Sequence, residues 1–194
     1  MLRPEYPIET ERLLLRPYRE ADIDALHDIQ SRPEVVRYLY WEPRTREQVE
    51  TVIRESSDQI DGEGGALTLA IQPRGSDAMV GDVVLMYHSE VHRQGEIGYV
   101  LHPDHQGHGY ATEAAREMLR LGFEQLDLHR IAGRLEARNS ASAAVLERLG
   151  MRLEGHLREN EWVKGEWQSE MDYAILEREW RAQRTLRESV KDGA

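Results

Sequence analysis

The sequence predicts one mixed α+β domain, with a mostly antiparallel sheet of about seven strands flanked by about four helices. Two observations lead to this prediction. Several short segments are β-rich with alternating apolar residues, and others repeat apolar residues at a helical period. These segments follow one another as strand, two helices, three strands, helix, strand, helix and two strands, so most of the sheet need not be parallel. Without a linker or repeat, residues 8–177 are expected to form a single domain, followed by a charged tail at 178–194.

The N-terminal third is expected to hold one strand and two helices, at residues 8–16, 21–30 and 45–60. Pro17 ends the strand and Pro33 ends the first helix, because proline removes a backbone donor and restricts the residue before it. Thr45 and Gln48 have the spacing of a capping box, which marks the start of the second helix. An aromatic stretch, VVRYLYWEP, connects the two helices.

The middle third is expected to hold three strands and one helix, at residues 66–72, 79–87, 95–101 and 110–126. The third of these strands should pair with the second across a loop. Small and apolar residues recur on one side of the helix, which suits close packing on a sheet. That side consists of Ala111, Ala114, Ala115, Met118, Leu121 and Gly122.

The C-terminal third is expected to add a strand, a helix and two further strands, at residues 130–137, 140–149, 151–163 and 166–176. Gly150 follows the helix directly, where a left-handed residue commonly ends it. Lys164 and Gly165 form a short turn between the last two strands, which predicts a hairpin. The charged residues after Glu177 are expected to be helical.

The stretch from Gly95 to Ala115 carries the main functional signal. A strand ends before Pro103, and a small-residue turn, Gln106–Ala111, leads directly into a helix. The first N–H groups of a helix have no partner inside it, and the helix dipole favours negative charge there. Glycine lets the backbone come close to a phosphate. The sequence therefore predicts an anion site at this turn.

Two common phosphate motifs do not match this turn. The Walker motif requires Lys and Ser or Thr after its last glycine, whereas Tyr110 and Ala111 follow Gly109. The dinucleotide fingerprint requires a glycine where Thr112 stands. The pattern that remains is Gln-x-x-Gly-x-Ala, with Gln106, Gly109 and Ala111 at its fixed positions.

This pattern resembles the acyl-CoA signature of the GNAT N-acetyltransferases, (Arg/Gln)-x-x-Gly-x-(Gly/Ala). Further blocks, in the same order, are similar to the RimJ/RimL-like branch, which includes the ribosomal-protein-alanine N-acetyltransferases. They are TERLLLR at 10–16, EIGY at 96–99, GYATEA at 109–114, NSAS at 139–142 and LERLGM at 146–151. The resemblance covers roughly residues 8–177. Gln106 departs from it, because many members of that branch carry Trp there.

The resemblance implies the GNAT acyl-CoA N-acyltransferase fold, with acetyl-CoA as co-substrate. It assigns the pyrophosphate to the backbone of the turn and of the first helical residues, namely Gln106, Gly107, His108, Gly109, Tyr110, Ala111 and Thr112. The pantetheine arm would add like a strand to the backbone of Tyr99, Val100 and Leu101. Asn139 would contact the CoA arm, and it can equally cap the helix that follows.

The same resemblance implies roles in catalysis. The Ser142 hydroxyl would face the CoA sulfur and stabilise the leaving thiolate. Glu161 would be the base that takes a proton from the acceptor amine, with Glu96 as the alternative on the strand before the turn. Strand alternation would put Glu159 on the same face as Glu161. Tyr40 and Trp41 would line the acceptor pocket.

Composition narrows the class of partner. The 194 residues contain no cysteine, so a thiolate nucleophile and disulfides are excluded, and the net charge is −11. This charge favours amines over nucleic acid or membrane surfaces. The histidines at 102, 105 and 108 lie on a turn without helical spacing, so no metal is expected. The default location is cytoplasmic, because no signal-like or membrane-spanning segment is evident.

The expected function is therefore direct transfer of an acetyl group from acetyl-CoA to a primary amine. Two alternatives stay open: a non-catalytic acyl-CoA-binding module, and an enzyme that uses a larger acyl group such as succinyl. The acceptor is open among a protein N-terminus, a polyamine, an antibiotic and a small metabolite. The oligomeric state is also open, and a homodimer is one alternative.

Overall fold

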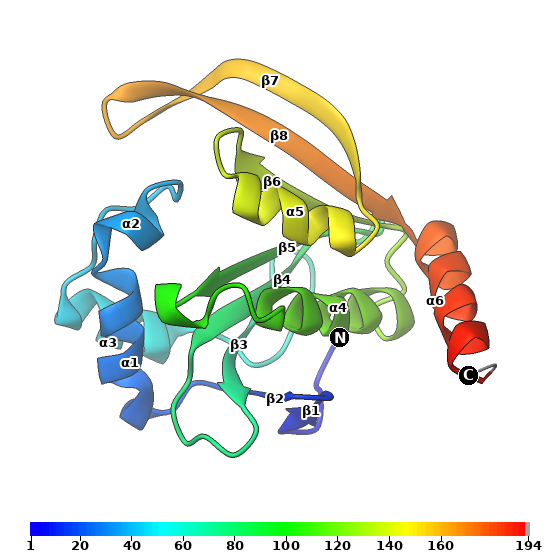
Figure 1. Ribbon diagram of the computed structural model, residues 1–194, viewed down its shortest axis with the longest axis horizontal. Helices are drawn as coiled ribbons and strands as arrows, with labels where there is room; N and C mark the ends of the chain where they lie inside the picture. Colours follow the sequence, from blue (N-terminus) through cyan, green and yellow to red (C-terminus); the bar gives the residue numbers. More distant parts are fainter. Residues whose placement is uncertain (193–194) are drawn as a thin grey trace.

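The computed structural model describes residues 1–192, with side chains through residue 186. Within these residues one sheet holds eight strands in the order β1-β2-β3-β4-β5-β6-β8-β7 (Figure 1). The strands are β1 (Ile8–Glu9), β2 (Leu13–Arg16), β3 (Ala66–Pro73), β4 (Gly81–Ser89), β5 (Gln94–Leu101), β6 (Arg130–Glu136), β7 (Arg152–Val163) and β8 (Glu166–Leu176). The helices are α1 (Ile23–Gln30), α2 (Pro33–Val36), α3 (Arg46–Glu55), α4 (Tyr110–Glu124), α5 (Ser140–Arg148) and α6 (Glu177–Asp192).

All neighbouring strands are antiparallel except β5 and β6, which are parallel. This parallel pair is short, because only Gln94–Glu96 pairs with Arg130–Ala132. Beyond Glu96, β5 remains paired with β4 as far as Leu101, while β6 continues along β8. The two strands therefore diverge, and the sheet is split in its middle.

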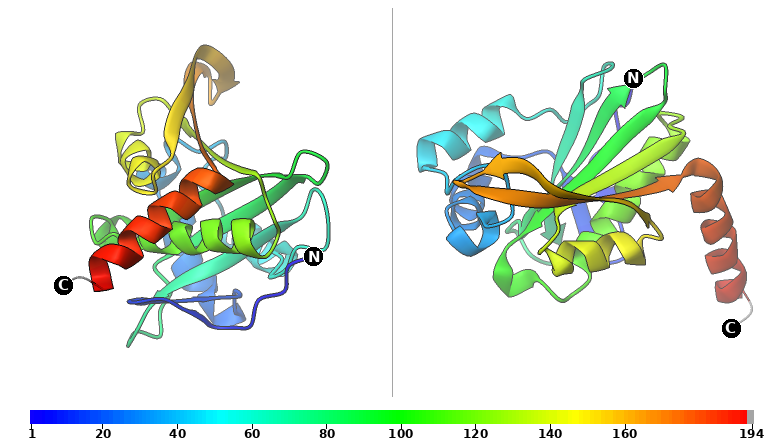
Figure 2. Two further views of the ribbon diagram at one scale, coloured as in Figure 1. Left: turned by 90° about the vertical axis from the view of Figure 1, so that its right-hand side faces the viewer. Right: turned by 90° about the horizontal axis from the view of Figure 1, so that it is seen from above.

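Helices cover both faces of the sheet (Figure 2). Residues of α4 and α5 pack in the main core, and residues of α1 and α3 pack in a second, smaller core. Neighbouring residues of β3 belong to different cores: Leu69 and Ile71 to the first, and Ala70 to the second. Because successive side chains of a strand point to opposite faces, the two helix groups lie on opposite sides of the sheet.

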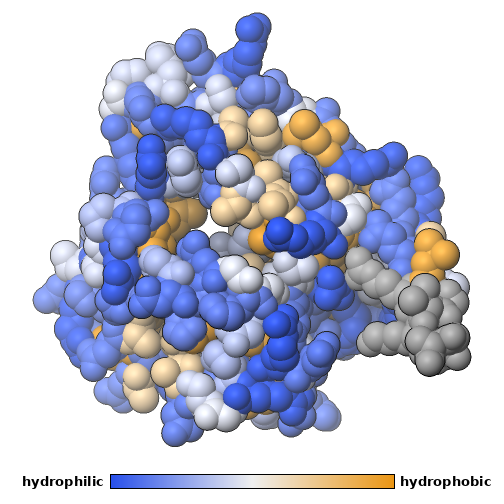
Figure 3. Space-filling model, in the orientation of Figure 1, coloured by the Kyte–Doolittle hydropathy of each residue, from blue (hydrophilic) through white to orange (hydrophobic). Residues whose placement is uncertain are grey.

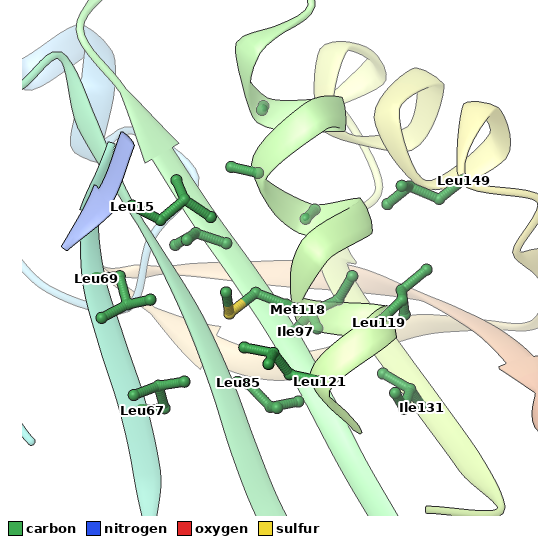
Figure 4. Close-up of a cluster of buried hydrophobic side chains, with 14 of the residues drawn as sticks. Leu15, Leu67, Leu69, Leu85, Ile97, Met118, Leu119, Leu121, Ile131 and Leu149 are labelled. Carbon is green, nitrogen blue, oxygen red and sulfur yellow. The ribbon is translucent and has the colours of Figure 1, made fainter. Parts of the chain in front are cut away.

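The core side of α4 is the predicted one. Ala111, Ala114, Ala115, Met118, Leu121 and Gly122 are all buried. Figure 4 shows Met118 and Leu121 beside Ile97 and Leu85 of the sheet, with Leu119 on the side of Ile131 and Leu149. At Gly122 an added Cβ would lie 2.6 Å from the terminal methyl group of Ile131, so a larger residue would require that side chain to move.

Several local predictions are confirmed. The Thr45–Gln48 capping box opens α3, Gly150 is left-handed after α5, and β7 and β8 form the predicted hairpin at Lys164–Gly165. The hairpin arches away from the rest of the molecule in Figure 1.

Other predictions need correction. The predicted strand 8–16 is two strands, because Thr10 turns the chain with hydrogen bonds to Leu13. The helix expected to reach residue 60 ends at Glu55, and Ile60 instead forms an isolated β-bridge with Leu2. The described residues hold eight strands and six helices rather than about seven and four.

The C-terminal charged segment is helical as expected, although residues 193 and 194 lie outside the described residues. Trp180 of α6 is buried, and its ring packs 5.3 Å from that of Phe123 in α4. Within the described residues, every helix is too short or too polar to cross a membrane.

Candidate active site

A cavity of about 430 Å³ lies where β5 and β6 diverge. Its wall comes from both sides of the sheet. Leu146 and Ser142 of α5 line one end, while Gln30 of α1 and Val52 of α3 line the other. In Figure 3 this face of the molecule is hollowed near its centre, with apolar side chains around the hollow. The cavity thus connects the α5 side of the sheet with the α1–α3 side.

The N-terminus of α4 begins just after β5, at the predicted anion site. Gly107 and Gly109 both have positive φ, at 78° and 80°, which a residue with a side chain rarely adopts. The first backbone hydrogen bond of α4 runs from the Glu113 N–H to the Gly109 carbonyl. Within the described chain, the N–H groups of residues 107–112 donate to no carbonyl. The buried Thr112 hydroxyl has no partner either. These donors suit a pyrophosphate at a helix N-terminus.

Arg12, which the sequence analysis treated only as part of a motif, holds this turn in place. Its guanidinium donates to the His108 carbonyl over 2.8 Å and to the Glu113 carboxylate over 2.7 Å. Thr10 also donates to Glu113. Arg12 is about half exposed beside the free N–H groups, so it adds positive charge where the anion is expected.

The β5 edge that faces the cavity has no strand partner beyond Glu96. Tyr99, Val100 and Leu101 lie on this edge, and Tyr99 and Val100 also line the cavity. The Gln106 side chain donates to the Leu101 carbonyl over 3.3 Å, which ties the turn back to the end of the strand. A free strand edge of this kind can accept an extended ligand through backbone hydrogen bonds.

Ser142 lies at the α5 end of the cavity and contacts Tyr99. The two hydroxyl oxygens are 3.0 Å apart, and the Tyr99 hydroxyl is also 3.0 Å from the Ser142 carbonyl oxygen. Burial raises the pKa of Tyr99 to about 12, although the Ser142 hydrogen bond opposes this, so the Tyr99 hydroxyl keeps its proton near neutral pH. Asn139 caps α5 by accepting from the Ser142 N–H, and it also lines the cavity.

Glu161 lines a second, smaller cavity of about 80 Å³, which shares Tyr40 and Arg134 with the first. The Tyr40 hydroxyl donates to Glu170 over 3.1 Å. Burial, Asp172 and Glu161 raise the pKa of Glu170, whereas Tyr40 lowers it. Glu161 therefore lies in an acidic neighbourhood beside the main cavity. Trp41 lines the main cavity, as the acceptor-pocket prediction requires.

The alternation expected along β7 does not hold. The register shifts between Leu157 and Glu161, and Glu159 within this bulge has a φ of 48°. Glu159 is exposed, and only Glu161 lines a cavity. A bulge resets which face each side chain occupies.

The Glu96 carboxylate contacts two side chains, those of His88 and Arg134. It lies 3.1 Å from His88 and 3.4 Å from Arg134, at the point where β5 and β6 still pair. It lines neither of the two cavities. Of the two carboxylates predicted as the base, Glu161 is therefore the one in a cavity wall.

Comparison with known proteins agrees with this geometry. The Acetyltransferase (GNAT) domain model matches residues 12–152. The chain belongs to the GNAT acetyltransferase family. It is 32% identical to YnaD of Bacillus subtilis, named as an uncharacterized N-acetyltransferase, over 89% of this chain and 98% of that protein. The GNAT-family acetyltransferase structure from Bacillus anthracis is 32% identical, with a TM-score of 0.79 over 92% of this chain and all of that one.

A more distant relative is the spermidine N(1)-acetyltransferase of Escherichia coli, 24% identical over 87% of this chain and 88% of that protein. The expected fold and the expected enzyme class, an acetyl-CoA-dependent N-acetyltransferase, are both confirmed. The split between β5 and β6, with the cavity that lies in it, is therefore the candidate active site.

Three charged residues line this cavity that sequence reasoning missed: Arg134 of β6, and two on the α1–α3 side, Asp82 of β4 and Arg44 in the loop before α3. No sequence motif marks any of them. The only signal for Asp82 is a carboxylate inside an otherwise apolar strand, GDVVLMY, which is costly to bury. Burial raises the pKa of Asp82 to about 6, although Tyr18 and Arg44 oppose the shift.

This shift predicts that Asp82→Asn stabilises the enzyme at pH 8. The folded pKa lies above the ordinary value of 3.8, so ionised Asp82 destabilises the fold above pH 6 and this cost disappears below pH 4. Two pKa units correspond to about 3 kcal/mol of stability gained when the charge is removed. The new amide would be buried without a partner, which costs about 1 kcal/mol of that gain. Urea unfolding should show a gain of about 2 kcal/mol at pH 8 that shrinks between pH 6 and 4.

Asp77 supplies the matched control, because it is exposed on the turn between β3 and β4. Asp77→Asn should leave the free energy of unfolding at pH 8 nearly unchanged, because it removes no buried group. A destabilised Asp82→Asn at pH 8 would contradict the prediction, since it would mean that the carboxylate supports the fold.

Proposed function

We propose that the protein transfers an acetyl group from acetyl-CoA directly to a primary amine, as a member of the RimJ/RimL-like branch of the GNAT family. One observation carries the proposal: a single cavity extends from the free β5 edge, at Tyr99 and Val100, to residues of α1 and α3 on the other side of the sheet. A cleft with two ends lets both substrates bind together, which direct transfer requires.

The residues present fit acetyl-CoA. The free N–H groups of residues 107–112 and the unpartnered Thr112 hydroxyl would bind its pyrophosphate, with Arg12 beside them. The free edge of Tyr99–Leu101 would bind the pantetheine amides. Bound in this way, acetyl-CoA supplies an activated thioester to the cavity.

Two side chains of the protein then assist the reaction, one as a proton acceptor and one as a hydrogen-bond donor. Glu161 accepts a proton from the acceptor ammonium, directly or through water, because only a neutral amine is a nucleophile. Ser142 donates a hydrogen bond to the leaving sulfur, and Tyr99 holds the Ser142 hydroxyl in place. Position in a cavity wall supports Glu161 over Glu96, whose carboxylate is already engaged by His88 and Arg134.

The acceptor is proposed to be a small-molecule amine or a protein N-terminus. The net charge of −11 and the carboxylates Glu161 and Glu170 beside the cleft support a substrate that approaches as a cation. Steady-state CoA release with a panel of amines tests this function. No release with any amine, despite acetyl-CoA binding, would indicate a non-catalytic module, and faster release from succinyl-CoA would indicate a larger acyl donor.

Acetyl-CoA is expected to raise the melting temperature. A ligand that binds only the folded state adds about 2.7 kcal/mol at a hundredfold excess over Kd. For a chain of this size that corresponds to roughly 5–10 °C in a thermal-shift titration. NAD and ATP at equal concentrations are the controls. A clear shift with either of them and none with millimolar acetyl-CoA would reject the cofactor assignment.

A further inference from the structure

The end of the cleft on the α1–α3 side carries two opposite charges that the proposed mechanism does not use. Asp82 and Arg44 both line the main cavity there, together with Tyr18 and Trp41. Ser142 lines the same cavity from the α5 side. An amine that enters past Asp82 and Arg44 would therefore come from the end of the cavity away from Ser142.

The Asp82 carboxylate is buried without a full set of partners. The residue is 8% exposed, and its Oδ2 atom has no hydrogen-bond partner among the described residues. The Tyr18 hydroxyl lies beside it and favours its charged form, yet burial keeps the pKa raised. An unpaired buried oxygen of this kind costs free energy, and a hydrogen-bond donor that enters the cavity would satisfy it.

Arg44 is held in place but has no anion partner. Its guanidinium stacks 4.1 Å above the Trp41 ring and donates to the Gln30 side chain over 2.8 Å. Its backbone N–H donates to the Gln30 carbonyl as well. Arg44 forms no ion pair among the described residues, and burial lowers its pKa although the charge of Asp82 raises it. A fixed planar fork of this kind suits a carboxylate.

We propose that this end of the cleft recognises a zwitterionic acceptor, an amino acid or a similar amine with a carboxylate close by, with Asp82 bound to its ammonium group and Arg44 to its carboxylate. The inference rests on the acetyltransferase function proposed above and names its substrate class. Asp82 orients the amine, and Glu161 accepts the proton in the transfer that follows.

The charges of this pocket disfavour a polyamine. Arg44 would repel a second ammonium group at the position where a carboxylate would bind. A simple alkylamine would satisfy Asp82 and leave the guanidinium desolvated and unpaired, which reduces its binding. A zwitterion satisfies both groups, so the carboxylate should govern which amines are accepted.

The test compares matched acceptors with the wild-type enzyme. Several L-amino acids are assayed beside their carboxamides and their decarboxylated amines, together with spermidine, by steady-state CoA release. The amino acids are expected to have a kcat/KM at least tenfold above that of each matched amide or amine, a factor that a site built for a charged group commonly provides. Equal or better turnover of the amines or of spermidine would overturn the inference.

Variants of Arg44 and Asp82 test whether these two residues cause the preference for zwitterionic acceptors. Arg44→Gln should remove the preference for the carboxylate and leave the KM for acetyl-CoA unchanged. Arg44→Lys keeps the charge without the fork, and should retain part of the preference even if the glutamine variant folds poorly. Arg37→Gln is the control, since Arg37 also stacks on an aromatic ring, that of Tyr38, but does not line either cavity. A preference that survives in both Arg44 variants would overturn the assignment.

Asp82→Asn should raise the KM for the amino acid about tenfold or more, with a smaller change in kcat. A loss confined to kcat would overturn the binding role. Changes in stability without any change in acceptor KM would show that Asp82 and Arg44 serve the fold alone, and this too would overturn the inference. Failure of every amine, zwitterions included, would instead reject the acetyltransferase function on which it rests.

Discussion

Gly109→Glu is expected to abolish acetyl-CoA binding while the enzyme remains folded. The new carboxylate would occupy the pyrophosphate position at the N-terminus of α4, where free N–H groups and the helix dipole attract an anion. It would also sit against Arg12, whose guanidinium lies 3.2 Å from where the Cβ would be. Isothermal titration should detect no acetyl-CoA binding at concentrations that saturate the wild type.

Gly75→Glu separates this effect from backbone strain. Gly75 has the same φ of 80° and open space around it, but it lies on the turn after β3. Both variants place a side chain at positive φ, at a cost of about 1 kcal/mol each. Gly75→Glu should melt slightly lower and bind acetyl-CoA normally. If Gly109→Glu also binds it normally, the pyrophosphate lies elsewhere.

Glu161→Gln is expected to lower kcat by about 10²-fold or more, the usual contribution of a general base. Glutamine keeps the shape and the hydrogen-bonding capacity but cannot accept the proton of the amine. The defect should shrink as the pH rises, because more of the substrate amine is then already neutral. The KM for acetyl-CoA should change little. The measurement is the pH profile of kcat between pH 6 and about 9.5.

Two companion variants make this result decisive. Ser142→Ala should lower kcat by a smaller factor without rescue at high pH, because its defect concerns the leaving sulfur. Glu96→Gln should retain near-wild-type turnover. If Glu161→Gln is active and Glu96→Gln is not, the base is on β5. If both glutamine variants are active, neither carboxylate takes the proton.

Local patterns were enough to predict most of the secondary structure. The Thr45 capping box and the left-handed Gly150 were predictable because each depends on a few neighbouring residues. The small-residue side of α4 was equally visible, since a helical repeat shows which face packs on the sheet. The turn at Thr10 and the bulge at Glu159 could not be predicted from the sequence, because each interrupts a continuous β-rich pattern that looks uniform in sequence.

The strand, turn and helix N-terminus around residues 106–112, where the anion is proposed to bind, could also be predicted, because one contiguous stretch supplies all three. The support of this turn by Arg12 could not, since Arg12 lies about a hundred residues away from Glu113 and His108. The same holds for Tyr99 and Ser142, whose hydroxyl groups meet only because β5 diverges from β6 beside α5.

The sequence by itself thus determined the order of the elements, the glycine turn before α4 and, through its motifs, the family. Only the tertiary structure decided which of the candidate carboxylates faces a cavity, and that Asp82 and Arg44 face the same one. The reason is physical: a motif encodes contacts between near neighbours, whereas a cleft is formed by strands and helices that meet only when the chain has folded.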